Sequence, residues 1–195
     1  MTFDVVEVIG NIIQENVTDL NPSRDKKKWV FPQYPEDATN LPEVVVKLSN
    51  VNFEPDSAGN FLYSDYNSET GIYKEYYYKK AIADLRLIVV TQKSNGQSAS
   101  LEGEHDGNKM FLRNQTLNIF LLEKIKNVLW SNREDLLEYF DKFKLESIES
   151  SFDNNKWSWG GIIQNKVEYK DCFVKEIEDG TIVSEYSIGM IVTKV

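Results

Sequence analysis

Residues 72–91, IYKEYYYKKAIADLRLIVVT, are the stretch that decides the fold of this 195-residue chain. Between residues 81 and 89, apolar side chains fill every odd position, while Asp84 and Arg86 stand at even positions. Successive side chains of a β-strand point to opposite faces, so this alternation predicts a strand with one wholly apolar face. That face must pack against a core formed by the rest of the chain.

The first part of the same stretch, residues 73–80, is too polar for a core. We expect it to project beyond the sheet as one arm of a hairpin whose partner is residues 61–66. Three consecutive tyrosines, residues 76–78, must point to both faces of a strand, so at least one lies outside any single core. Tyrosine is enriched at protein interfaces because it buries a large ring and keeps a polar tip. We predict interface residues on this arm and at a bend nearer the amino terminus: Tyr63, Tyr66, Tyr73, Tyr76 and Tyr78, together with Trp29 and Tyr34.

Two amphipathic helices flank the central strand. Apolar residues recur three and four positions apart in residues 5–17, with Thr2 as a plausible N-cap, and again in residues 114–130. Residues 131–140 predict a further short helix, with Ser131 as N-cap and Glu134 three positions later.

The remaining segments predict further strands and connections. Two prolines within residues 29–35 favour an extended path, across the sheet or against a neighbouring subunit. The polar stretch 92–109 predicts a long loop, and Gly160-Gly161 predicts a turn or bulge. Asp179-Gly180 is the strongest hairpin signal in the chain. Additional strands are expected at residues 43–51, 144–152, 162–178 and 181–193.

This order of elements predicts an α+β fold. We expect a mainly antiparallel sheet with two amphipathic helices packed on one face and a projecting β-hairpin arm. Residues 1–195 form a single domain in this prediction, and residues 52–80 form its protruding tyrosine-rich hairpin or loop insertion.

Composition narrows the classes of function. The chain has 31 acidic and 22 basic residues, a net charge of −9, which argues against non-specific nucleic-acid binding and against an anionic membrane surface. Its longest apolar runs are about four residues, far below the roughly 20 that a membrane-spanning helix needs. We therefore expect no membrane partner.

The sequence holds few of the side chains that catalysis requires. His105 is the only histidine, and it stands between Glu104 and Asp106 in a polar stretch. Cys172 is the only cysteine, so an internal disulfide is excluded. Nucleophilic catalysis by Ser or Cys normally needs a histidine base, and most zinc sites need several His or Cys ligands. We predict that the protein is not an enzyme and has no catalytic residue, cofactor or metal.

The whole chain resembles the tail terminator (tail-completion) proteins of long-tailed bacterial and archaeal viruses. The segments that carry the resemblance include the opening helix FDVVEVIGNIIQENV (residues 3–17), the bend RDKKKWVFPQYP (24–35) and the strand PEVVVKLSNV (42–51). They continue in the arm running into ADLRLIVVTQKS (83–94), the helix NQTLNIFLLEKIKNVLW (114–130) and the closing hairpin. The length of the polar arm and the Trp157–Trp159 turn lie outside the family pattern, and both core packing and contact remain open for that turn.

The resemblance implies a virion structural protein of the tail and neck, made in the host cytoplasm during assembly. Such a protein forms a ring of identical subunits, a hexamer in this family, at the head-proximal end of the tail tube. The ring stops tube polymerisation and joins the tail tube protein to the head-completion or connector protein. DNA passes through the lumen without specific binding.

Two other functions are compatible with the residues. A small carbohydrate- or protein-binding module would use the exposed Tyr and Trp faces for stacking. A hydrolase would need an acid pair that assembles only in three dimensions, which the sequence does not define.

Overall fold

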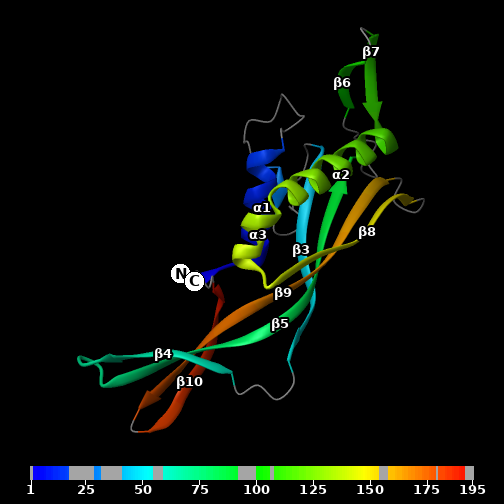
Figure 1. Ribbon diagram of the computed structural model, residues 1–195. Helices are drawn as coiled ribbons and strands as arrows, with labels where there is room; N and C mark the ends of the chain where they lie inside the picture. Colours follow the sequence, from blue (N-terminus) through cyan, green and yellow to red (C-terminus); the bar gives the residue numbers. More distant parts are fainter. Residues whose placement is uncertain are drawn as a thin grey trace.

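The computed structural model describes residues 2–17, 29–31, 41–54, 59–91, 100–105, 108–153, 158–178 and 180–191. The predicted α+β fold is confirmed: helices pack on one face of a mostly antiparallel sheet (Figure 1). The described helices are α1 (Val5–Asn16), α2 (Asn114–Ser131) and α3 (Arg133–Tyr139). The strands of the main sheet are β1 (Thr2–Phe3), β2 (Val30–Phe31), β3 (Glu43–Phe53), β4 (Asn60–Asn67), β5 (Ile72–Val90), β8 (Lys142–Asp153), β9 (Ser158–Glu178) and β10 (Thr181–Ile191).

The spatial order of the strands is β1-β10-β9-β5-β3-β2, with β4 also pairing with β5 and β8 also pairing with β9. The two longest strands, β5 and β9, form the spine of this sheet. Residues 73–90 of β5 pair with residues 177–160 of β9 without a register shift. At about 3.3 Å per residue, the 19 residues of β5 span roughly 60 Å. Only one half of this length lies beneath the helices (Figure 1).

The helix-covered half contains the core. The odd-numbered residues 81–89 of β5 are all buried, which confirms the predicted apolar face. They join one cluster with buried residues such as Ile9 and Ile13 of α1 and Leu121 and Ile125 of α2. Burial of the apolar stripes of two helices on this face is what holds α1 and α2 to the sheet.

The residues that precede and cap the helices differ from the predicted N-caps. Asp4 caps α1, because its carboxylate accepts hydrogen bonds from the N–H of Val6 at 2.7 Å and of Glu7 at 3.4 Å. Thr2 lies instead in β1, opposite Ile191 of β10. Ser131 is the last residue of α2, and Asn132 precedes α3 without a side-chain capping bond.

Two segments that were predicted as a loop and as a turn or bulge contain strands instead. Part of the polar stretch 92–109 forms β6 (Ser100–His105), which pairs with β7 (Asn108–Arg113) in a separate two-stranded sheet. Its polarity is compatible with a hairpin that stands outside the main sheet. Gly160 and Gly161 lie within β9 and pair with Val90 and Val89 of β5. A glycine is needed at 161 because a Cβ there would collide with Asn118 and Leu122 of α2.

The sheet continues beyond the helix layer. We call this part the sheet extension: β4, residues 72–80 of β5, residues 170–178 of β9, and β10 (Figure 1). The predicted hairpin of residues 61–66 with residues 73–80 is present: β4 pairs with residues 72–78 of β5. The sequence did not predict that β9 and β10 extend beside it, which makes the projection four strands wide instead of two.

Candidate functional site

One face of the sheet extension carries an exposed apolar row. Tyr66 of β4 pairs with Tyr73 of β5, which pairs with Ile177 of β9, which pairs with Ile182 of β10. Directly paired residues of an antiparallel sheet share a face, so these four side chains cross the extension as a continuous row. Tyr66 is 59% exposed and Ile182 is 53% exposed. The row faces the same side as the helices, because β5 keeps its alternation from residue 73 to residue 89.

A second aromatic group on this face lies nearer to the core. The rings of Tyr77 and Phe173 stack with centroids 5.5 Å apart, and Phe61 meets Tyr77 edge-on at 5.6 Å. Lys79 lies 4.6 Å above the Phe173 ring, and Lys175 lies 4.8 Å from the Tyr77 centroid. These contacts are made within one chain, and Phe173 is buried. The group therefore stiffens the root of the extension.

The opposite face of the extension carries a separate row. Tyr63 and Tyr76 stack with centroids 4.3 Å apart and an interplanar angle of 15°. Tyr76 pairs with Val174, which pairs with Tyr186 of β10. Partial burial is the first cause that raises the pKa of Tyr63, followed by the neighbouring Tyr76. Tyr78 lies on this face opposite Cys172, with Lys170 5.4 Å from its ring centroid.

A polar cluster ties three strands of the extension together. Lys74 of β5 lies 2.7 Å from the carboxylate of Glu176 in β9, which also accepts a hydrogen bond of 2.7 Å from Ser184 of β10. The hydroxyl of Tyr186 donates to the other carboxylate oxygen at 3.2 Å. These hydrogen bonds, led by that of Lys74, lower the pKa of Glu176, and the pairing raises the pKa of Lys74. The strands are thus held in register.

The predicted interface residues do not form one patch. Tyr66 and Tyr73 lie on the helix side of the extension, whereas Tyr63, Tyr76 and Tyr78 lie on the opposite side. Tyr63, Tyr66 and Tyr73 are exposed, and the other two are half-buried.

The bend residues have different outcomes. Trp29 is fully buried, so its side chain cannot lie in a surface contact as predicted. It is buried because β2 begins at the next residue and pairs in parallel with β3, while Gln14 of α1 accepts a hydrogen bond from the Trp29 N–H at 3.1 Å. Tyr34 lies outside the described residues, and so does Trp157.

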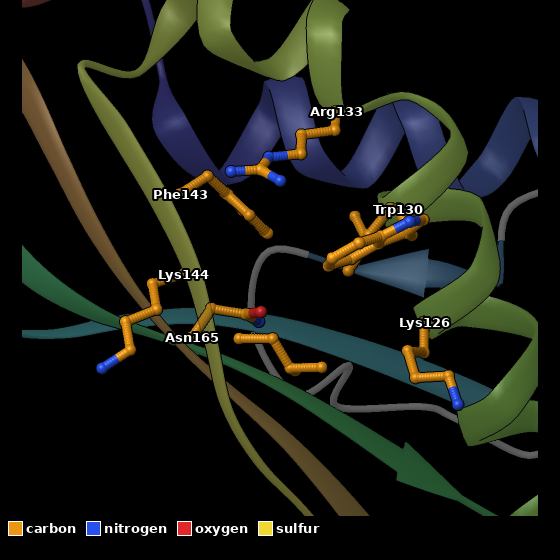
Figure 2. A pocket seen from close by; sticks show the side chains of 8 residues that line it. Lys126, Trp130, Arg133, Phe143, Lys144 and Asn165 are labelled. Carbon is orange, nitrogen blue, oxygen red and sulfur yellow. The ribbon is translucent and has the colours of Figure 1, made fainter.

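A pocket of about 290 Å³ lies in the helix-covered half of the molecule, between α2, α3 and strands β8 and β9 (Figure 2). Its walls are largely apolar, and its charged lining residues are cations. The lining residues are Lys126, Leu129, Trp130, Arg133, Phe143, Lys144, Leu145 and Asn165. Trp130 is 66% exposed, and the Arg133 guanidinium lies 5.5 Å from its ring centroid.

Asn165 is the unusual residue of this pocket. It lies on the helix-covered face of β9 between the buried residues Ile163 and Val167, and it is itself fully buried. Neither its amide nitrogen nor its amide oxygen has a hydrogen-bond partner among the described residues. A buried polar group without a partner costs about 1–3 kcal/mol.

The described residues bring together little that could support catalysis. They contain no group of three or more His, Cys, Asp or Glu side chains placed to hold a metal ion. Cys172 is buried, and that burial raises the pKa of its thiol. Among the same residues, no helix has both the length and the apolar character needed to cross a membrane. The extension and the pocket are therefore the candidate binding surfaces of the described residues.

No family model matches the chain, and no curated protein matches it.

Proposed function

We propose that the protein is a virion structural protein, a tail terminator whose copies form a ring at the head-proximal end of a viral tail tube. In this role the ring stops polymerisation of the tube protein and joins the tail to the head connector. The single observation that carries the proposal is the exposed row Tyr66–Tyr73–Ile177–Ile182 on an extension that lies outside the helix layer.

The row is suited to contact with another protein chain. Monomeric proteins seldom expose contiguous apolar patches of large area, and such patches usually mark an interaction site. The row spans four paired strands whose register is held by the Lys74–Glu176 pair and by the stacked Tyr77 and Phe173 rings. A preformed surface loses little conformational entropy when it binds. The extension is therefore built to present these side chains.

The net charge of the chain supports the proposal that the protein lies in a tube that conducts DNA. The net charge of −9 repels the DNA backbone, so a ring of such subunits lets DNA pass through its lumen without holding it. The expected partners are other copies of the chain, the tail tube protein and the head-completion or connector protein.

The function is tested by adding the purified protein to polymerising tail tube protein from the same virus. Light scattering should show that tube growth stops, and electron microscopy of gold-labelled protein should place the label at one tube end. The double variant Tyr66→Ser, Tyr73→Ser should fail to arrest growth, because its apolar row is broken. A matched control is Ile119→Ser, which removes an apolar side chain exposed on α2 to a similar degree.

Undiminished tube growth with the wild-type protein, or label along the whole tube, would contradict this function. A binding module for carbohydrates would instead show a shift of tryptophan emission on titration with oligosaccharides, with no effect on tubes.

A further inference from the structure

We propose that the sheet extension joins two copies of this chain edge to edge, with strand β10 of one copy paired antiparallel to strand β4 of the next. The inference rests on the proposed ring and names the two surfaces that meet in it. A ring built head to tail needs two different, complementary patches on each subunit. The outer strands of the extension supply them, because β4 forms one of its edges and β10 forms the other (Figure 1).

Both edges lack a partner strand over most of their length. Among the described residues, β4 pairs with β5 alone, and β10 pairs with β9 and, only at Met190 and Ile191, with β1. An edge strand presents a row of backbone N–H and C=O groups to which a further strand can bind. Large apolar side chains are exposed along both edges, among them Phe61 and Tyr63 of β4 and Ile182 of β10.

The side chains of the two edges do not block such pairing. Natural edge strands are commonly protected by lysine or proline. Neither β4 nor β10 contains a lysine, an arginine or a proline. Bulges, which also protect edges, interrupt both strands, but residues 63–67 of β4 and residues 184–187 of β10 are free of them. These regular segments are the ones that we expect to pair.

The direction of the strands favours a head-to-tail junction. Neighbouring strands of the extension are antiparallel throughout, β4 to β5, β5 to β9 and β9 to β10. Strands β4 and β10 therefore run in opposite directions, so β10 beside β4 of the next copy continues the same alternation. Pairing of β10 with a second β10 would instead close a two-fold dimer and leave both β4 edges bare.

The residues at the two edges are complementary. Four rows of paired residues cross the extension, and their ends in β4 and β10 are Tyr66 and Ile182, Asp65 and Ser184, Ser64 and Glu185, and Tyr63 and Tyr186. When copies join in register, each of these β10 residues lies opposite its β4 counterpart in the next copy. Apolar then meets apolar, tyrosine meets tyrosine, and no carboxylate faces another, so no like-charged pair opposes the junction. A shift by one residue would bring unlike faces together.

Ser64 and Glu185 are the pair best suited to a hydrogen bond across the junction. The Ser64 hydroxyl accepts a hydrogen bond of 2.7 Å from Tyr73, so its own proton remains available to a further acceptor. The Glu185 carboxylate lies 3.9 Å from the Lys175 ammonium, a long ion pair that leaves it room to accept. Directly opposite residues of an antiparallel pair have Cβ atoms about 4.5–5.5 Å apart, which is within reach of this contact.

Disulfide trapping in assembled protein tests the junction directly. The full chain is made with Ser64→Cys in one preparation and Glu185→Cys in another, and the native Cys172 is buried. When the two are assembled together and mildly oxidised, covalent dimers should form, because directly paired residues are close enough for a disulfide. Neither preparation alone should give them. Ser187→Cys, two positions along the same face of β10, is the matched control and should trap far less with Ser64→Cys.

Reversal of charge gives the second measurement. Ser64→Glu places a carboxylate opposite Glu185 of the next copy, which should raise the association midpoint about fivefold. Adding Glu185→Lys in the same chain should restore association, because the opposed groups then attract. Within one chain, the second change replaces the Lys175–Glu185 pair with two neighbouring lysines. An effect confined to the subunit itself would therefore make the double variant weaker still.

The outcomes separate the two proposals. Covalent dimers from one preparation alone, no trapping in the mixture, or a double variant weaker than Ser64→Glu would overturn the edge pairing while leaving the ring intact. Failure of the wild-type chain to associate at all would overturn both.

Discussion

Trp29 and Tyr66 are both large aromatic residues, yet one is fully buried and the other is 59% exposed. Residue type and local polarity do not distinguish them, because each stands near charged residues in the sequence. The difference comes from pairing: β2 places Trp29 beside α1, whereas β4 lies outside the helix layer. The sequence therefore identified aromatic residues that must be buried in some contact. For Trp29 it did not determine that the contact lies within the same chain.

Tyr169 gives a prediction at this scale. Burial, followed by Asp171 and Asp4, raises the pKa of its phenol to about 12 from an ordinary value of 10.0. The unfolded chain loses this proton first, so the folded state loses stability as the pH rises from about 10 to about 12. The loss corresponds to roughly 2–3 kcal/mol. Denaturation of wild type and Tyr169→Phe across this range measures it: the variant should show a smaller decline, and equal declines would contradict the prediction.

Glu176 gives a prediction at acidic pH. Its pKa is lowered, first by the hydrogen bond from Lys74, from an ordinary value of 4.5. The stabilisation from its charged form is therefore complete above about pH 4.5 and is lost as the pH falls through the lowered pKa. Wild type should be more stable than Glu176→Gln at neutral pH, and the difference should vanish in acid. A difference that stays constant in urea titrations between pH 7 and pH 2 would refute this sign.

Among the elements, β9 shows most clearly which part of the fold the sequence determines. The alternating pattern of residues 162–178 predicted a strand, and the structure confirms it. The same pattern places a polar residue, Asn165, between the apolar residues Ile163 and Val167 of one face, which is a signal that could have located the pocket. The pairing of β9 with both β5 and β8 could not be predicted, because partner choice depends on contacts distant in sequence.

Gly161 gives the prediction for this element. Asn118 of α2 donates a hydrogen bond to the Val89 carbonyl at 3.0 Å and accepts one from Ser150 at 2.9 Å, so it is fixed close above β9. A methyl group at position 161 would collide with Asn118 and Leu122. Gly161→Ala should lower the free energy of unfolding by about 1–3 kcal/mol.

Gly160→Ala is the matched control, because the nearest atom to its added Cβ is the Val89 carbonyl oxygen at 3.9 Å. Chemical denaturation should show a much smaller loss for this variant. Equal losses at the two glycines would mean that the approach of α2 is not what requires Gly161.

At the scale of the whole molecule, a sheet roughly 60 Å long is covered by helices over one half only. The exposed row lies on the uncovered half, and the cationic apolar pocket lies in the covered half, 12 residues away along β9 when counted from Ile177 to Asn165. Such an arrangement gives one subunit two separate surfaces. A chain that worked alone would gain nothing from exposing Tyr66, Tyr73 and Ile182 to water.

The most direct test is the mass of the particles that the protein forms, measured by native mass spectrometry over a range of concentrations, alone and with the tail tubes of its own virus. We predict a closed oligomer of fixed stoichiometry, lost in the Tyr66→Ser, Tyr73→Ser variant and retained in Ile119→Ser. A wild-type chain that stays monomeric at every concentration and beside every tube would contradict the claim that other copies cover the exposed row.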